Sequence, residues 1–406
     1  MKHLVILCDG MADYPIEALG GLTPLQYAST PSFDRLARMG RSGLLTTVPD
    51  GLPPSSDVAN LAILGYNPAE VYEGRGVLEA AGSGYRPGPD DMVMRCNLVS
   101  VSPDGILTGH NGGGVTAEEG RQLIALLDNR LGSDRMRLIA GDRYRHLLVI
   151  KGGSKHIVCN APHDHIGSEW MRLLVSPAVN APDEPGRMSA AATADLLNAL
   201  IKDSHHLLSC TGVNKRCCAD ALWPWSPGYP ARIAPLASLW PGKIEAGAVI
   251  TATDVIRGIG HYAGLDIIDV PGATGTVDTC YEAKARAAID ALRTHDFVFL
   301  HIEGADEASH EGDLGLKLQA IERTDSRLTR IIVDELNGEN SDVGIALLPD
   351  HFTSVERRVH GSDPVPVTIY IPGVEPDSVD AFDETSCAEG ALGRQPAREF
   401  MELFMQ

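Results

Sequence analysis

Hydrophobic residues form short, nearly continuous runs toward both ends of the chain, and helical patterns separate these runs. Residues 3–8, 296–302, 343–348 and 365–371 are apolar stretches of strand length. Residues 314–336 instead repeat Leu and Ile near the 3.6-residue spacing of a helix. Apolar strands that alternate with helices are typical of a mostly parallel sheet covered on both faces. The pattern therefore predicts a doubly wound α/β core.

The middle of the chain has a different texture. Short β-like runs lie at residues 92–94, 97–101 and 146–150. Two longer helical patterns lie at residues 117–131 and 188–202. Residues 223–230 are rich in Pro, Gly and Trp, which indicates a loop close to a domain boundary. We therefore predict a discontinuous core domain of residues 1–72 and 241–406, interrupted by a smaller α+β domain of residues 73–240.

Length and composition agree with two globular domains. The chain has 406 residues, of which 44% are hydrophobic and 22% are charged. No apolar run approaches the ~20 residues that a membrane helix needs. The formal net charge of -20 makes the protein a poor partner for nucleic acid or for an anionic membrane.

The first apolar run indicates a buried strand rather than a signal peptide. The run is short, it stops at Asp9, and no small-residue cleavage site follows it. The eight cysteines include no C-x-x-C pair, so a Cys-rich zinc site is not expected. We expect a cytoplasmic protein whose cysteines are reduced.

Acidic and histidine side chains follow the predicted strands. Asp9, Asp306 and the adjacent Asp350 and His351 each lie just beyond the end of an apolar run. Taken singly, each has a plainer interpretation, such as capping a turn or pairing at the surface. The carboxyl ends of parallel strands meet at one edge of a sheet, where α/β proteins bind their ligands. We therefore expect these side chains to converge.

Two further histidines extend this set to a metal-ligand pattern. His310 lies four residues after Asp306, so one turn of helix would point both side chains the same way, and His360 follows in a loop. Three Asp and three His suit zinc or manganese better than calcium. Six ligands are too many for one catalytic ion with an open position, but they suit two divalent ions. The pattern does not choose between Mn, Zn, Mg and Co.

Ser56 is the candidate nucleophile. It follows a turn-rich stretch and lies near the N-terminus of a helix predicted at residues 58–64. Coordination to a divalent cation activates a hydroxyl, and a helix N-terminus offers N–H groups to a phosphate. Both Ser55 and Ser56 are also candidates for the N-cap of this helix, which is the simpler interpretation of either residue alone.

Motifs spread along nearly the whole chain carry a family resemblance. They are Cys8–Asp13, Ser56–Leu61, Leu64–Tyr66, Gly74–Gly76, Arg95–Val99, Pro162–Asp164, Trp223–Trp225, Arg257–Gly260, Pro271–Gly275, Asp306–His310, Asp350–His351 and His360–Pro366. With them the chain resembles the archaeal-type cofactor-independent phosphoglycerate mutases of the alkaline phosphatase superfamily. Ser226 and Ser55 depart from the family pattern, because Gly is usual after the second Trp and common before the serine.

The resemblance implies specific roles for the candidate residues. One ion would be held by Asp9, Ser56, Asp350 and His351, and the other by Asp306, His310 and His360. An alkaline-phosphatase-like core would be interrupted by a smaller domain that closes over the substrate. The residues implied to contact the substrate are basic, with one acid–base pair: Arg95, Arg145, Arg216, Arg257, His163 and Asp164.

The implied reaction is a relay of the phosphoryl group. Ser56 would take it from 3-phosphoglycerate and return it to the other hydroxyl, giving 2-phosphoglycerate without 2,3-bisphosphoglycerate as a cofactor. His163 and Asp164 are the candidates for giving the leaving alkoxide its proton. The same serine and metals would also serve a homoserine kinase or a phosphatase, and a non-catalytic metal-binding protein is a third alternative. We expect a small phosphorylated substrate, no nucleic acid and no membrane; the oligomeric state is left open.

Overall fold

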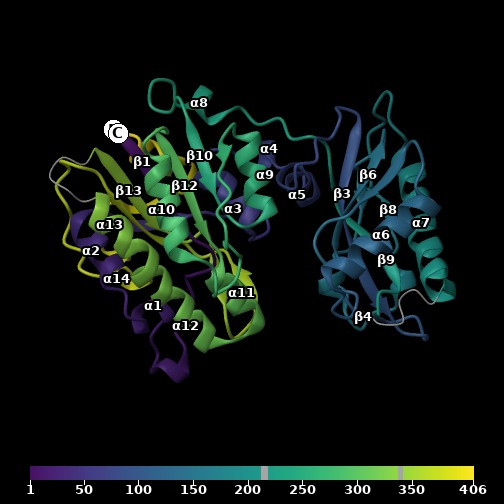
Figure 1. Cartoon of the computed structure of the whole chain (residues 1–406), viewed down its shortest axis with the longest axis horizontal. Coiled ribbons are helices and arrows are strands. Elements are labelled where there is room, and N and C mark those ends of the chain that lie inside the picture. Colours follow the sequence, from purple (N-terminus) through teal and green to yellow (C-terminus); the bar gives the residue numbers. More distant parts are fainter. Residues whose placement is uncertain (212–217, 337–341) are drawn as a thin grey trace. The chain divides into compact units, whose positions relative to one another are not determined.

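The computed structural model describes residues 1–211, 218–336 and 342–406 and divides the chain into two compact units (Figure 1). Unit 1 consists of Met1–Tyr72 and Ile233–Gln406, and unit 2 of Glu73–Arg232. The second boundary therefore lies eight residues before the expected one at 240/241. The reason is that the segment after Arg232 packs on unit 1, where Tyr66 Oη donates to Ala234 O at 2.7 Å.

The core of unit 1 is a mostly parallel eight-stranded sheet with the order β11-β10-β12-β1-β13-β16-β2-β17. Only β16 runs against its neighbours. Strand β1 is central, because it pairs in parallel with β12 on one side and with β13 on the other. The strand bounds are β1 Lys2–Cys8, β2 Arg41–Thr46, β10 Gly247–Ile250, β11 Asp266–Ile267, β12 Phe297–Ile302, β13 Val343–Leu348, β16 Val365–Tyr370 and β17 Gly393–Pro396, with the hairpin β14 Phe352–Ser354 and β15 Val359–Gly361.

Helices lie on both faces of this sheet. One face is covered by α2, α10, α12 and α13, whose apolar side chains share a core with Leu4 and Ile6 of β1 (Figure 1). Helices α3 and α9 pack against each other outside that core. The helix bounds are α1 Pro24–Tyr27, α2 Pro31–Met39, α3 Ser56–Ile63, α4 Pro68–Val71, α8 Leu236–Leu239, α9 Asp254–Tyr262, α10 Tyr281–Ala291, α11 Gly304–Glu311, α12 Leu314–Arg323, α13 Arg330–Leu336, α14 Glu384–Ala388 and α15 Phe400–Phe404.

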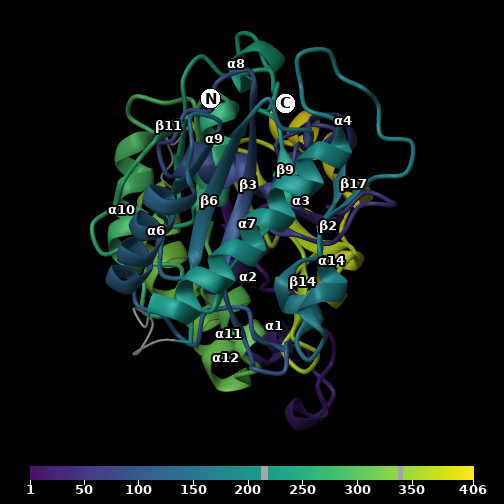
Figure 2. The same cartoon turned by 90° about the vertical axis from the view of Figure 1, so that its right-hand side faces the viewer.

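Unit 2 is an antiparallel sheet with helices packed on it. The strand order is β4-β3-β6-β5. Strand β9 also pairs with β3, along the edge opposite to β6. Figure 2 shows α6 and α7 in front of β3 and β6, and their apolar side chains share one core. The bounds are β3 Asp91–Val101, β4 Leu107–Gly109, β5 Met136–Ile139, β6 Arg145–Lys151, β7 Ile157–Val158, β8 Ser176–Pro177, β9 Ala221–Gly228, α5 Arg75–Gly82, α6 Ala117–Leu131 and α7 Ala190–Thr211.

One expectation about the elements is wrong. Most of the stretch predicted as a loop at 223–230 belongs to strand β9, in which Asn97 of β3 faces Trp223. Proline is tolerated there because, among the strands that the structure describes, β9 pairs only with β3, so one of its sides carries no ladder. The helix predicted at 314–336 is confirmed as the continuous helical segment α12, a π-helical stretch at Thr324–Thr329, and α13. Among the described helices, none is long and apolar enough to cross a membrane.

Candidate metal centre and its serine

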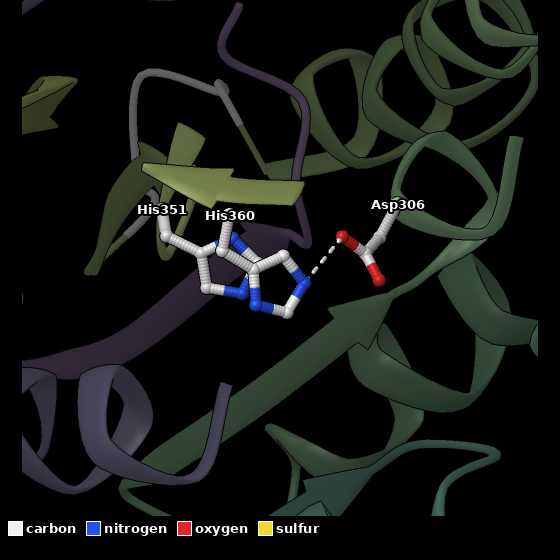
Figure 3. A group of neighbouring side chains, drawn as sticks. All are labelled: Asp306, His351 and His360. Atoms are coloured by element: carbon white, nitrogen blue, oxygen red, sulfur yellow. Dashed lines mark ion pairs between the residues drawn. The ribbon is translucent and has the colours of Figure 1, made fainter. Parts of the chain in front are cut away.

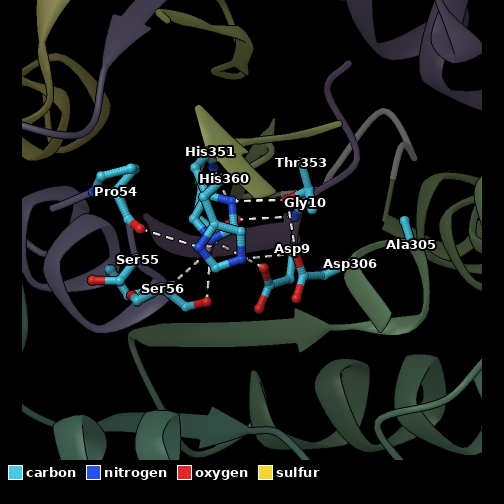
Figure 4. A network of polar contacts seen from close by, with 12 residues as sticks. Asp9, Gly10, Pro54, Ser55, Ser56, Ala305, Asp306, His351, Thr353 and His360 are labelled. Atoms are coloured by element: carbon cyan, nitrogen blue, oxygen red, sulfur yellow. Dashed lines mark hydrogen bonds and ion pairs between the residues drawn. The ribbon is translucent and has the colours of Figure 1, made fainter. Parts of the chain in front are cut away.

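The first group of polar side chains lies at the carboxyl ends of the central strands of unit 1. Asp9 follows β1, and Asp350 and His351 follow β13, so parallel pairing of the two strands brings the three together. His351 Nε2 lies 3.6 Å from Asp9 Oδ1 (Figure 4). The same nitrogen lies 3.5 Å from Asp350 Oδ2. All three side chains are buried. Gly10 N donates to Asp350 Oδ1 at 3.1 Å and fixes that carboxylate.

The second group lies beside the first. Asp306 is on α11, which begins just after β12, and His310 follows one turn later. His360 comes from β15, and Figure 3 shows its ring beside that of His351 and close to Asp306. Asp306 Oδ2 lies 3.3 Å from His310 Nε2, and Asp306 Oδ1 lies 3.4 Å from His360 Nε2. The ring centroids of His351 and His360 are 4.0 Å apart, so the two groups adjoin.

Ser56 is the first residue of α3, and its side chain is half-buried. Its Oγ lies 3.2 Å from His351 Nε2 (Figure 4). Ser55 occupies the N-cap position but makes no capping bond, because its hydroxyl donates to the carboxylate of Asp57 instead. One turn into the helix, Asn60 Nδ2 donates to Ser56 O at 2.7 Å and to Asp350 Oδ2 at 3.0 Å. Asn60 thus ties the serine to the first group.

The hydrogen bonds of two imidazoles fix which nitrogen carries the proton. His310 Nδ1 lies 3.2 Å from Arg358 O, and His360 Nδ1 lies 3.1 Å from Pro54 O. A carbonyl can only accept, so in the neutral ring each Nδ1 carries the hydrogen and each Nε2 carries a lone pair. The two Nε2 atoms face each other at 2.8 Å. Two lone pairs at this distance repel unless a proton or a metal cation lies between or beside them, and the hydrogen bond to Asp306 raises the pKa of His310.

The buried carboxylates also need positive charge nearby, because they repel one another. Burial and the neighbouring Asp350 and Asp306 raise the pKa of Asp9 well above its usual value. Asp9 Oδ1 is buried and has no hydrogen-bond partner among the described residues. Carboxylate oxygens and imidazole nitrogens are common ligands of divalent cations such as zinc and manganese. The donor set therefore fits two divalent cations, and their four positive charges would balance three carboxylates and an ionised serine.

A buried histidine next to Asp9 was missed by the sequence prediction. His301, in β12, is completely buried; its Nε2 lies 3.1 Å from Asp9 Oδ2 and its Nδ1 lies 3.1 Å from Thr251 Oγ1. Two residues on, burial raises the pKa of Glu303 to about 8 against the opposing charge of Lys284. The signal was present in the sequence, because two polar residues flank Ile302 at the end of an otherwise apolar strand.

A threonine between the two groups was also missed. Thr353, in β14, donates from Oγ1 to Asp306 Oδ1 at 2.7 Å and lies 3.1 Å from His351 Nδ1. Its carbonyl accepts a hydrogen bond from Lys317 Nζ at 2.7 Å, and that buried ammonium also pairs with Asp13 at 2.8 Å. Nothing in the sequence distinguishes this threonine from the other threonines of the chain.

Unit 2 carries a separate cluster of basic side chains. Arg95 is almost completely buried, and its Nη1 donates to Glu79 Oε1 at 2.8 Å. Its guanidinium also lies over the ring of Trp225, 5.0 Å from the centroid. Arg75 pairs with the same carboxylate oxygen at 2.9 Å. Burial alone would raise the pKa of Glu79, but the two arginines outweigh that effect and hold it below its usual value.

The other predicted residues of unit 2 lie around this cluster. Arg145 is exposed, and its guanidinium lies 5.1 Å from the centroid of the Tyr144 ring. His163 is exposed as well; its ring lies 5.3 Å from that of Trp225, and its Nε2 lies 3.7 Å from Asp164 Oδ1. Burial, with a smaller contribution from nearby positive charges, lowers the pKa of His163.

Two predicted arginines remain. Arg216 falls outside the described residues. Arg257 is on α9 of unit 1, where its Nη1 pairs with the carboxylate of Asp269. The structure therefore brings together all seven residues predicted to bind metal in unit 1. Arg95, Arg145 and His163 belong to unit 2, and Arg257 belongs to unit 1.

Comparison with known proteins identifies the family. Residues 37–214 match the family model described as 2,3-bisphosphoglycerate-independent phosphoglycerate mutase. The chain is 41% identical to the protein of that name from Methanosarcina barkeri, with 100% of each chain covered. Among solved structures, a protein from Pyrococcus horikoshii is 30% identical with a TM-score of 0.80, covering 100% of this chain and 96% of that one. The cofactor-independent phosphoglycerate mutase from Thermoplasma acidophilum is 27% identical with a TM-score of 0.65, and the match covers 100% of this chain and 99% of that one. The chain belongs to the family of 2,3-bisphosphoglycerate-independent phosphoglycerate mutases.

Proposed function

We propose that this chain interconverts 3-phosphoglycerate and 2-phosphoglycerate through a phosphoserine at Ser56, with no 2,3-bisphosphoglycerate as cofactor. Family membership supports the mutase reaction. The relatives reported above that carry a functional name are called mutases, which favours this reaction over a homoserine kinase or a phosphatase built on the same groups.

The position of the Ser56 hydroxyl carries the proposal. Ser56 Oγ is 3.2 Å from His351 Nε2, in a half-buried position beside the two groups of carboxylates and imidazoles. Because Ser56 is the first residue of α3, it also lies at the positive end of the helix dipole, which favours an incoming phosphate. Ser55, its neighbour, has its hydroxyl bonded to Asp57 and is not in this position.

We assign two divalent cations to the same place. One would be held by Asp9, Ser56, Asp350 and His351, and the other by Asp306, His310 and His360. When bound, the cations lower the pKa of the serine hydroxyl and offset the negative charge of the phosphoryl group. The donor set does not distinguish manganese, zinc, magnesium and cobalt, and metal analysis of the purified protein tests this assignment directly.

The chain's own residues account for the bonds that change. Ser56 Oγ gives up its proton and attacks phosphorus, and the bond between phosphorus and the substrate oxygen breaks. The released alkoxide takes a proton, for which we propose His163 with Asp164 as the donor pair. The second hydroxyl of glycerate then returns a proton to this pair and attacks the phosphoserine. The bond between phosphorus and Ser56 Oγ breaks, and Ser56 is regenerated. Water must be kept out, because it would hydrolyse the phosphoserine.

We assign recognition of the substrate's negative charges to the basic residues. Arg145 is exposed and carries a guanidinium, which suits a carboxylate or phosphate. Arg95 is buried and paired with Glu79, so we propose that it orients Trp225 and His163 and adds positive charge nearby. Arg216 and Arg257 stay candidates for the same task.

Trapping the phosphoserine tests the proposal. The protein is incubated with 3-phosphoglycerate labelled in its phosphate and quenched in acid, and the label is located by peptide mass spectrometry. Label is expected on Ser56, and an enolase-coupled assay is expected to show mutase activity. Ser56→Ala should lose both, with activity falling by about 10⁴-fold or more, as for other nucleophilic serines.

Ser55→Ala is the matched control, because it removes a hydroxyl one residue away and should retain labelling and turnover. A parallel assay with ATP and homoserine examines the alternative function. Substantial mutase activity in Ser56→Ala, or product from ATP and homoserine alone, contradicts the proposal.

A further inference from the structure

The three imidazoles of the candidate centre are held in two different ways. His310 and His360 each direct Nδ1 at a backbone carbonyl, which can only accept a hydrogen bond. His351 directs Nδ1 at the hydroxyl of Thr353, at 3.1 Å. A hydroxyl can donate or accept, so this contact alone leaves open which nitrogen of His351 carries the proton.

Asp306 fixes the direction of that contact. The Thr353 hydroxyl has one hydrogen, and it donates this hydrogen to Asp306 Oδ1 at 2.7 Å. An ionised carboxylate can only accept. Thr353 Oγ1 must therefore accept from His351, which places the proton of the neutral ring on Nδ1. The lone pair of His351 is then on Nε2, the atom that faces Ser56 Oγ at 3.2 Å and Asp9 Oδ1 at 3.6 Å.

The threonine itself has no freedom to turn away. It is completely buried, its N–H donates to Ala12 O at 3.0 Å, and its carbonyl accepts from Lys317 Nζ at 2.7 Å. Gly10, with φ of 60°, packs so closely that a Cβ built there would lie 2.5 Å from Thr353 Oγ1 and from Asp306 Oδ1. The hydroxyl is thus held at one position between the two groups.

We propose that Thr353 is a positioning residue that couples the two metal groups. A single hydroxyl orients Asp306, a ligand assigned to one ion, and sets the tautomer of His351, a ligand assigned to the other. The inference rests on the metal centre of the proposed function. Partners of this kind that orient ligands change metal affinity by about 10–100-fold when they are removed. Loss of this one hydroxyl should therefore weaken the binding of both ions.

Isothermal titration of the metal-free, full-length protein with Mn²⁺ tests the coupling. Thr353→Val keeps the branched shape and removes the hydroxyl, and we expect it to weaken both binding events by about 10–100-fold. Thr353→Ser keeps a hydroxyl and should restore most of the affinity. Thr329→Val is the matched control, because Thr329 is also completely buried and its Oγ1 has no hydrogen-bond partner among the described residues. Its Mn²⁺ affinity should equal that of the wild type.

The tautomer provides a readout that does not depend on activity or bound metal. In ¹⁵N spectra of the metal-free protein, the His351 resonance is identified by its loss in His351→Gln. It should show a protonated Nδ1 in the wild type and in Thr353→Ser, and a mixture of tautomers in Thr353→Val. Equal Mn²⁺ affinity of Thr353→Val and the wild type, or weakening of only one binding event, overturns the coupling. Intact Mn²⁺ binding without mutase activity in the wild type contradicts the proposed function alone.

Discussion

His310 Nε2 and His360 Nε2 lie 2.8 Å apart, although one residue is on α11 and the other on β15, 50 positions later. Both rings are turned by backbone carbonyls so that their lone pairs meet. Folding therefore brings two electron-rich atoms together without a hydrogen to share in the neutral rings. The arrangement is favourable only when a proton or a metal cation lies between the two atoms.

Removal of metal should accordingly destabilise the protein. A cation that binds only the folded chain adds about 2.7 kcal/mol per site at a free concentration 100-fold above its dissociation constant. Thermal unfolding with Mn²⁺ and after dialysis against a chelator should show a clear drop in Tm. His360→Gln should lose part of the metal-dependent gain, whereas Gln at the exposed His206 should keep all of it. A Tm that changes neither with Mn²⁺ nor with the chelator contradicts this expectation.

Acid should destabilise unit 2 through His146. Burial lowers the pKa of His146 to about 3, and its Nδ1 accepts a hydrogen bond from Gly141 N at 3.1 Å. The unfolded chain takes up this proton near pH 6.5 and the folded chain does not, so stability is lost as the pH falls through that value. The loss between pH 7 and pH 5 is about 2 kcal/mol.

Urea unfolding at both pH values measures this loss. Tryptophan fluorescence suits unit 2, which holds three of the four tryptophans: Trp170, Trp223 and Trp225. His146→Gln lowers stability at pH 7, because it disturbs the contact with Gly141, but it should flatten the change between the two pH values. An unaltered pH dependence in that variant shows that other groups are responsible.

Breaking the buried pair of Lys317 and Asp13 should destabilise unit 1. The ammonium and the carboxylate are both buried and lie 2.8 Å apart. Lys317→Met leaves a buried carboxylate without its countercharge, which costs about 3–5 kcal/mol. Adding Asp13→Asn removes the orphaned charge and should recover part of this loss. Thermal unfolding followed by circular dichroism compares the single and double variants, and a double variant less stable than Lys317→Met contradicts the argument.

Arg145 should affect substrate binding more than turnover. If its exposed guanidinium contacts the substrate's negative charge, Arg145→Ala loses a charge-assisted hydrogen bond of about 1.5–3 kcal/mol. We expect the KM for 3-phosphoglycerate to rise about tenfold or more while kcat changes little. Arg137→Ala is the control, because Arg137 is exposed on the same unit and pairs with Asp128 at 3.1 Å. An unchanged KM removes Arg145 from the substrate site.

The sequence was most informative where burial alone decides the structure. The apolar run 343–348 is strand β13 and the pattern at 117–131 is helix α6, both with the predicted bounds. A strand buried on both faces must be apolar throughout, and a half-buried helix must repeat every 3.6 residues, so both leave a visible trace. The polar residues just beyond such strands could be placed for the same reason.

Contacts made by single side chains left no such trace. Thr353 acquires its place from Asp306, 47 positions away, and no pattern marks it. The polar residues that flank Ile302 do mark His301, but they do not reveal its contact with Asp9. Strand β9 was missed because its prolines suggest a loop, whereas pairing on one side only makes them tolerable. These features depend on the finished packing, which local sequence does not encode.

The central place of β1 has a consequence for how the protein is made. This strand is synthesised before all of unit 2, yet its hydrogen-bonding partners, Phe297–Ile302 and Val343–Leu348, are synthesised after unit 2. Unit 2 is contiguous and can fold while translation continues. The apolar N-terminal segment must stay unpaired through most of that time, so it is a natural substrate for chaperones that bind nascent chains.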